Sequence, residues 1–232
     1  MDTLNILYMA LVILIIIIYL TAFKNGKPTC NNYILNNYLY LILSLLLFVI
    51  FIINLQKTNI NIFNNTLIHI LYIIFILFIV ILLSRPSSKF IYKHSILILF
   101  ILLLSLSSSL VYKYIDKDQF IKICIQLGII LLFMTILALQ FPSFFKDKYL
   151  PYIIFGLFMI IVSHLIDAIF YKNEHQKNIS YISVVIFSLL MVYDTKKIMF
   201  SKLCNPVDYT STTAGLFLDI INMFQNLYIL DN

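Results

Sequence analysis

The feature that most constrains this chain is a series of eight long apolar segments separated by short polar connections. Each segment reaches the length of roughly 20 residues that an α-helix needs to cross the hydrocarbon core of a bilayer. The five prolines fall in the connections or at segment ends, where helix breakers belong. The sequence therefore predicts an all-α fold, a polytopic transmembrane helix bundle. The segments lie at about 4–23, 35–55, 65–84, 95–112, 119–140, 150–171, 180–200 and 209–230.

The composition agrees with a membrane protein. Of the 232 residues, 62% are hydrophobic and only 11% are charged, which is far outside the range of soluble domains. Polar runs are at most about a dozen residues long, so a separate soluble domain has no room. The net charge of +6 comes from lysines at segment ends. It indicates topology in the membrane rather than nucleic-acid binding.

The charges of the connections predict an orientation. The odd-numbered connections hold ten basic residues and the even-numbered ones hold six. The positive-inside rule then places the odd-numbered connections in the cytosol and both termini on the far side. The first segment has no basic residue before it and no small-residue cleavage pattern, so we expect a retained helix. The three cysteines show no metal-binding spacing, and we expect them to be reduced: Cys30, Cys124 and Cys204.

Two aspartates lie inside the last two apolar segments. Asp194 comes a few residues before the end of segment 180–200, and Asp219 lies close to the middle of segment 209–230. A carboxylate at membrane depth costs roughly 2.5–3.5 kcal/mol on insertion scales, so it is rarely kept without a use. Both residues are therefore candidates for a functional site.

The last segment carries a polar stripe. Its members recur at spacings of 3 and 4 residues, which places them on one face of a helix. Leu, Ile, Phe and Met make up most of the other faces. We expect the stripe to face the protein interior and the last helix to be central in the bundle. The stripe consists of Thr212, Gly215, Asp219, Asn222 and Asn226.

The two aspartates are expected to lie near each other. A connection of about eight residues joins the two segments, which favours an antiparallel helix pair. At helical rise, the two carboxylates then differ in depth by only ~6 Å. A second interpretation of Asp194 stays open, because Lys196 and Lys197 follow at once and are typical of the membrane interface.

These residues resemble a known family. The run VYDTKKI, which contains Asp194, and the run LFLDIINMF, which contains Asp219, are similar to the C-terminal signature of the transmembrane Bax inhibitor motif family. The resemblance covers roughly 181–230 well, and helix order and hydropathy extend it toward residue 35. It implies a seven-helix Bax-inhibitor-like membrane domain over 35–232. Residues 1–34 are then an extra N-terminal transmembrane helix and loop.

The same resemblance suggests a basic partner for Asp194. Arg85 ends the third segment on the side predicted to be cytosolic, where Asp194 is also expected. Some members of the family hold a basic residue at the end of the corresponding helix against the first aspartate. Arg85 is therefore a candidate counter-ion. The simpler alternative, an anchor at the membrane interface, stays open.

The resemblance and the carboxylates together predict a function. Hard cations such as Ca²⁺ prefer oxygen ligands, so Asp194 and Asp219 are candidate ligands for a bound or permeant Ca²⁺. Two neighbouring carboxylates cannot both ionise cheaply, so one proton is shared and competes with the cation. The resemblance implies a pH-sensitive calcium or cation leak and inhibition of apoptotic cell death. It also implies other membrane regulators of cell death as partners. For a eukaryotic or viral protein, we expect an endomembrane location (endoplasmic reticulum or Golgi).

Two alternatives belong to other classes. A non-conducting membrane scaffold or regulator of cell death would use the aspartates for packing alone. An intramembrane aspartyl protease also places two aspartates on adjacent helices, but that family needs Gly-x-Gly-Asp on the second helix. Leu216 and Leu218 stand at the glycine positions here, so we expect no enzymatic activity.

Overall fold

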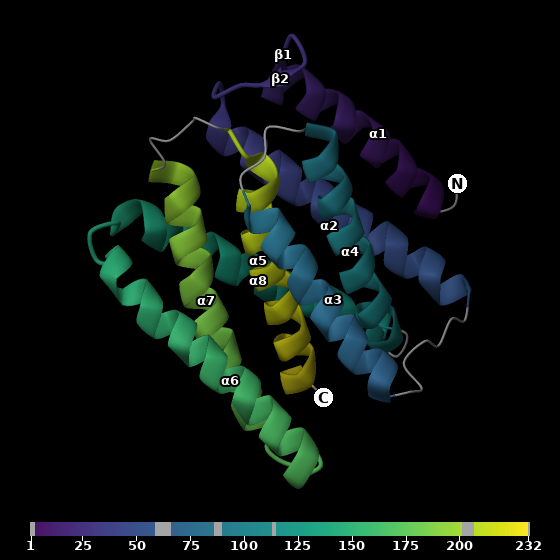
Figure 1. Cartoon of the computed structure of the whole chain (residues 1–232), viewed down its shortest axis with the longest axis vertical. Coiled ribbons are helices and arrows are strands. Elements are labelled where there is room, and N and C mark those ends of the chain that lie inside the picture. Colours follow the sequence, from purple (N-terminus) through teal and green to yellow (C-terminus); the bar gives the residue numbers. More distant parts are fainter. Residues whose placement is uncertain (1–2, 59–65, 86–89, 113–114, 201–206, 232) are drawn as a thin grey trace. The chain divides into compact units, whose positions relative to one another are not determined.

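All eight apolar segments fold as α-helices in the computed structural model of the chain (Figure 1). The structure describes residues 3–58, 66–85, 90–112, 115–200 and 207–231. The helices are α1 (Thr3–Ala22), α2 (Tyr33–Lys57), α3 (Thr66–Ser84), α4 (Phe90–Tyr112), α5 (Lys117–Gln140), α6 (Leu150–Phe170), α7 (Gln176–Phe200) and α8 (Tyr209–Asp231). A short hairpin, β1 (Phe23–Lys24) and β2 (Lys27–Pro28), follows α1, and a 3₁₀ turn, η1 (Asp147–Tyr149), precedes α6.

Length and apolarity make the described part of this fold a multi-pass membrane bundle. Seven of the described helices are long and apolar enough to cross a membrane. The eighth helix, α3, is apolar over Leu71–Ser84. Large apolar side chains are exposed along α1, α3, α5 and α6. Such continuous apolar surface is what lipid tails cover.

The chain divides into two compact units. The first comprises Met1–Ile115 and Lys202–Ala214, and the second comprises Asp116–Ser201 and Gly215–Asn232. The boundary therefore passes through α8, between Ala214 and Gly215. The predicted division separates an N-terminal helix (residues 1–34) from a seven-helix domain (35–232). It is not a division into compact units, and it stays a prediction.

The first unit is built around α2 and α4. α1 and α4 pack against α2, and α3 packs against α4. The hairpin that ends α1 turns at Asn25 and Gly26, whose φ angles are 52° and 73°. Asn-Gly is the residue pair that accepts positive φ at both positions of a two-residue turn. The hairpin thus reverses the chain from α1 toward α2.

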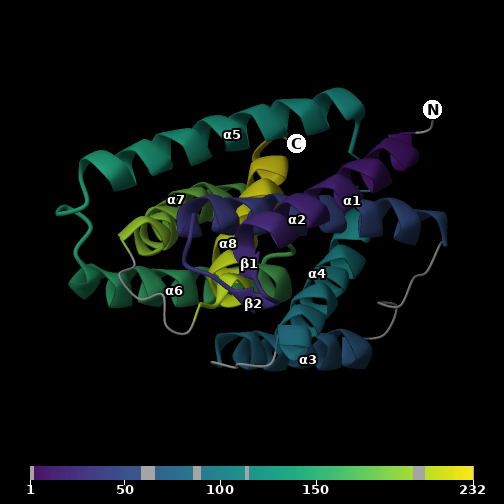
Figure 2. The ribbon, with the colours of Figure 1, turned by 90° about the horizontal axis from the view of Figure 1, so that it is seen from above.

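The second unit is built around α7. Both α5 and α6 pack against α7, which Figure 2 shows between them. Pro151 stands in the first turn of α6, where its missing N–H removes no helical hydrogen bond. The apolar windows of α5 and α6 are only 6% buried, whereas that of α7 is 44% buried. α7 is the interior helix of this unit, and α5 and α6 offer their outer faces to lipid.

The last helix is the most enclosed of the candidate spans. Of the residues in its most apolar stretch, 56% are buried, against 11% for α1. The buried residues of α8 include the polar Asp219 and also apolar residues on other faces, such as Phe217 and Met223. α8 is therefore buried on several faces, and its predicted central position in the bundle stays a prediction.

Two sequence predictions about single residues need correction. The predicted segment bounds place Lys93 in the connection before segment 95–112, but α4 begins at Phe90, so Lys93 lies in its first turns and is buried. Cys30 is disulfide-bonded rather than reduced, and Cys204 lies outside the described residues. A disulfide is typical of an oxidising compartment, whereas the charge bias places the connection of Cys30 in the cytosol. The disulfide and the charge bias therefore give opposite indications of the side of the membrane on which this connection lies.

Candidate functional site

The two intramembrane aspartates lie in the second unit, on α7 and α8. Asp219 is 7% exposed, and Asp194 is partly buried. They are close enough for the charge on one carboxylate to act on the other. Within the described residues of this unit, neither carboxylate forms an ion pair. The site is therefore a pair of carboxylates in a low-dielectric environment, in which the charge of Lys197 acts on Asp194 without a direct ion pair among the described residues.

Gly215 makes the approach of the two helices possible. A Cβ atom built on Gly215 would lie 2.5 Å from Oδ2 and 3.5 Å from Cγ of Asp194. The carboxylate of Asp194 therefore rests directly on the backbone of α8, in space that any side chain would fill. Asp219 follows four residues later on the same face of the helix. The polar stripe thus has a gap at Gly215 that receives the carboxylate of the neighbouring helix.

The other polar members of the stripe mostly satisfy themselves along α8. Asn222 Nδ2 donates to the Leu218 carbonyl at 2.9 Å, and Asn226 Nδ2 donates to the Asn222 carbonyl at 2.8 Å. Asn226 Oδ1 is buried without a hydrogen-bond partner among the described residues. Thr212 Oγ1 donates to the Asp208 carbonyl at 3.0 Å. Asp219 is the ionisable member of this face, and the predicted supporting role of the amides stays a prediction.

The two lysines that follow Asp194 do not behave alike. Lys196 Nζ forms an ion pair with Asp147 Oδ1 at 2.8 Å and donates to the Phe145 carbonyl at 2.7 Å. Lys197 is exposed. Lys196 therefore ties the end of α7 to the connection between α5 and α6 instead of neutralising Asp194.

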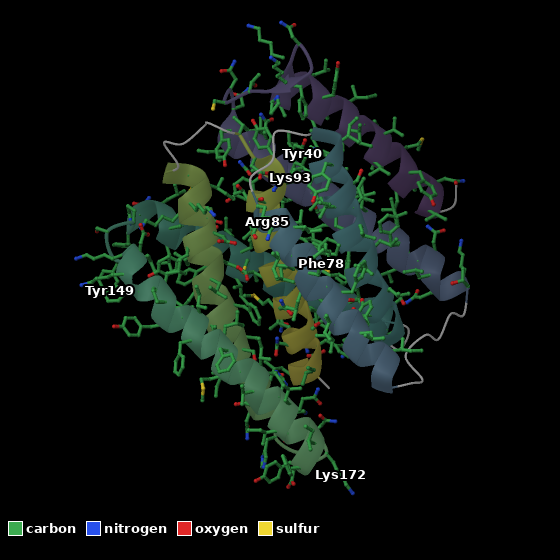
Figure 3. The ribbon with its side chains drawn as sticks, in the orientation of Figure 1. Tyr40, Phe78, Arg85, Lys93, Tyr149 and Lys172 are labelled. Atoms are coloured by element: carbon green, nitrogen blue, oxygen red, sulfur yellow. The ribbon has the colours of Figure 1, made fainter. Side chains whose placement is uncertain are left out.

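Arg85, the predicted counter-ion of Asp194, is exposed just after the end of α3 (Figure 3). It belongs to the first unit, and Asp194 belongs to the second. The pairing of Arg85 with Asp194 therefore stays a prediction, and so does the alternative in which Arg85 is an interface anchor.

Sequence reasoning missed a buried ion pair in the first unit. Lys93 Nζ lies 2.9 Å from Asp208 Oδ2, with side-chain exposures of 4% and 24%. The same ammonium donates to Ser211 Oγ at 3.0 Å and to the Leu83 carbonyl. Asp208 also caps α8, because its Oδ1 accepts from the Ser211 N–H at 3.0 Å. The pair joins the first turn of α8 to α4 and to the end of α3.

These contacts set the charge of Asp208. Burial raises its pKa, but hydrogen bonds from Thr210, Lys93 and Ser211 outweigh burial and hold the pKa below its ordinary value. The aspartate that directly precedes an apolar run is a recognisable N-cap signal in the sequence. Its partner Lys93 lies more than a hundred residues earlier, and no local pattern marks it.

A second polar cluster of this unit surrounds the same helix end. Tyr40 and His94 share a hydrogen bond of 2.8 Å between Oη and Nε2. Asn36, fully buried, donates from Nδ2 to the Tyr209 hydroxyl at 3.3 Å. The ring of Tyr209 stacks between those of Tyr33 and Tyr40, at centroid distances of 5.5 and 5.3 Å. Figure 3 labels Tyr40 and Lys93 at this end of the unit.

The sequence match that decides the family covers the same helices. A family model described as "Inhibitor of apoptosis-promoting Bax1" matches residues 30–231, from just before α2 to the end of α8. The chain belongs to the Bax inhibitor-1 family. α1 lies outside the matched residues. No curated protein matches this chain.

This Bax inhibitor-1 family protein offers few ligands for a tightly held metal ion. Among the described residues, no group of three or more His, Cys, Asp or Glu side chains could hold one. Asp194 and Asp219 supply carboxylate oxygens near each other. Two carboxylates suit a weakly bound or passing Ca²⁺ better than a resident ion, which would need six or more oxygens.

Gly215→Ala should change the site of this Bax inhibitor-1 family protein while sparing its fold. The new methyl group would displace the Asp194 carboxylate, which ends a flexible side chain, and alanine favours a helix by about 1 kcal/mol over glycine. We expect unchanged or slightly higher thermal stability in detergent and an altered pH dependence of cation flux in liposomes. Gly128→Ala, also inside a helix but with no atom within 4 Å of the added Cβ, is the matched control. Flux identical in the two variants would remove Gly215 from the site.

Proposed function

We propose that this protein is a pH-sensitive leak for Ca²⁺ or related cations in an endomembrane, through the Asp194–Asp219 pair. The observation that carries the proposal is the contact between the Asp194 carboxylate and Gly215. Gly215 lies one helical turn from the buried Asp219. An arrangement that brings two acids together at membrane depth is costly, and a cation or a proton relieves the cost.

The chemistry follows from competition between the two ligands. When both carboxylates are ionised, their four oxygens attract a hard divalent cation and partly replace its water. When a proton is shared between them, the pair holds a single negative charge and attracts the cation less strongly. Ca²⁺ and H⁺ therefore bind in opposition. A change in either should alter how α7 and α8 pack around Gly215.

Inhibition of apoptotic cell death is the second part of the proposal. It rests on membership in the family described as inhibitors of apoptosis-promoting Bax1. A leak that lowers stored Ca²⁺ gives this activity a physical route, with other membrane regulators of cell death as partners. The endoplasmic reticulum or Golgi is the proposed location.

Two other functions use the same residues differently. A non-conducting scaffold would keep the aspartates for packing, and its flux would equal that of empty liposomes. An aspartyl protease would need open backbone before the second aspartate, but Leu216 and Leu218 stand there and Leu216 is 1% exposed. We therefore propose that the protein is not an enzyme.

The test is Ca²⁺ efflux from liposomes that contain the purified full-length protein, measured between about pH 6 and 8. We expect efflux above that of protein-free liposomes, with a pH dependence that added external Ca²⁺ shifts. Efflux that equals the protein-free background at every pH would exclude the leak and leave the scaffold.

A further inference from the structure

An apolar groove runs between α5 and α7 in the second unit. Its volume is about 330 Å³, and its walls include Ile130 and Phe133 from α5 and Val184 and Leu189 from α7. The one polar residue in its wall, Ser188, donates its hydroxyl to the Val184 carbonyl at 2.7 Å. The groove therefore offers a ligand apolar contact and no free hydrogen-bonding group. Its mouth faces the outer, membrane-exposed surface, because Phe133 is 54% exposed.

A second hollow, of about 440 Å³, lies at the end of α7 beside the connection between α5 and α6. Ser143, Lys146, Tyr149 and Tyr193 line it together with apolar residues. We call it the basic hollow. Leu189 lines both the basic hollow and the apolar groove, so the two meet at this side chain.

The backbone of the basic hollow is held in place by α7. Tyr193 donates its hydroxyl to the Lys146 carbonyl at 3.0 Å, and its ring meets that of Phe145 edge to face. Lys196 donates to the Phe145 carbonyl and pairs with Asp147. The connection is thus fixed before any ligand arrives, which lowers the entropic cost of binding.

The charge of the basic hollow is positive. The acidic residue of the connection, Asp147, is already matched by Lys196 at 2.8 Å. Lys146 and Lys148 are exposed, and in the described part of the chain neither forms an ion pair. Lys148 lies over the Tyr149 ring, 5.0 Å from its centroid. Lys146 and the hydroxyl-bearing Ser143 and Tyr149 therefore line a hollow that adjoins the apolar groove, and the Lys148 ammonium lies beside it, over the Tyr149 ring.

We propose that the basic hollow and the apolar groove together bind one anionic phospholipid. Lys146 and Lys148 bind the phosphate, the Ser143 and Tyr149 hydroxyls donate to its oxygens, and one acyl chain passes Leu189 into the groove. The position suits this ligand, because α5 ends at Gln140 and α6 begins at Leu150, so the hollow lies where spanning helices meet the lipid headgroups. A water-soluble anion would use only the hollow, and an apolar peptide would leave the lysines unmatched.

The test compares lipids and two pairs of lysines on the purified full-length protein. Binding of phosphatidylglycerol and phosphatidylcholine is measured by native mass spectrometry from detergent. We expect the parent to prefer phosphatidylglycerol, and the double variant Lys146→Gln/Lys148→Gln to bind it about 25-fold more weakly, at about fivefold per lysine. Phosphatidylcholine binding should not change.

The matched control removes two exposed lysines from the other end of α6. Lys172→Gln/Lys177→Gln lowers the net charge equally, and Figure 3 shows Lys172 far along α6 from Tyr149. We expect less than a twofold loss of phosphatidylglycerol binding. An equal loss in both double variants would show a general effect of charge and overturn the site.

A second comparison tests the groove. Dihexanoyl phosphatidylglycerol carries the same headgroup on short chains, so the parent should bind it more weakly than the dioleoyl lipid. Inorganic phosphate at equal concentration should not displace the dioleoyl lipid. Equal binding of the two chain lengths, or displacement by phosphate, would reduce the site to an anion-binding surface and contradict the proposal.

Discussion

Lys93→Ala is expected to lower the free energy of unfolding by roughly 3 kcal/mol, the lower end of what breaking a buried ion pair costs. Lys93 is nearly inaccessible, and its removal leaves Asp208 charged in a site that excludes most water. The estimate takes the lower end because 24% of the Asp208 side chain stays exposed. The Leu83 carbonyl and the Ser211 hydroxyl also lose a donor.

Thermal denaturation in detergent measures this loss. For a chain of this size, roughly 3 kcal/mol corresponds to a fall of about 6–12 °C in the midpoint. Lys172→Ala removes an exposed lysine and should change the midpoint by no more than about 2 °C. Lys93→Met/Asp208→Asn removes both charges and should recover much of the loss, since the penalty lies in the unpaired ion. Equal midpoints for Lys93→Ala and Lys172→Ala would show that the ion pair does not stabilise the fold.

The same pair makes stability depend on pH. Because the pKa of folded Asp208 lies below its ordinary value, its contribution is fully present above the unfolded pKa of about 3.9. It is lost as the pH falls through the folded pKa. The parent should therefore lose more stability on acidification below about pH 4 than Lys93→Met/Asp208→Asn does.

The helices could be predicted because their length and apolarity are local properties. Segment 209–230 was predicted within one residue of α8. The start of α4 was placed at residue 95 instead of Phe90, because Lys93 and His94 resemble a polar connection. Lys93 and His94 can lie inside the helix because Asp208 and Tyr40 supply them with polar partners. Those partners come from other segments of the chain. Tertiary contacts of this kind leave no trace in the periodicity of one segment.

The candidate site was predictable in part for the same reason. The spacing along α8 placed Gly215 and Asp219 on one face, since helical geometry alone decides that. The contact between the Asp194 carboxylate and Gly215 depends on how close α7 comes to α8. A single sequence does not specify that distance. The Lys93–Asp208 pair was missed altogether, because its lysine matches the ordinary pattern of a charge flanking a membrane helix.

Asp219→Asn is expected to abolish the pH dependence of the proposed cation leak. Asparagine has nearly the shape of aspartate but cannot ionise, so the pair can no longer share a proton. One carboxylate is also lost as a ligand, and the apparent affinity for Ca²⁺ should fall on the order of tenfold. Thermal stability should stay the same or rise, because a buried carboxylate without an ion-pair partner in its unit is removed.

Ca²⁺ efflux from liposomes between about pH 6 and 8 tests this expectation, with Asp118→Asn as the control. Asp118 is an exposed carboxylate in the first turn of α5, so the substitution makes the same chemical change outside the pair. Asp194→Asn should resemble Asp219→Asn, and the double variant should add little, since both single changes break one interaction. A pH response in Asp219→Asn equal to that of Asp118→Asn would contradict the carboxylate-pair proposal. A fall in the thermal stability of Asp219→Asn would then assign the two aspartates to packing between α7 and α8.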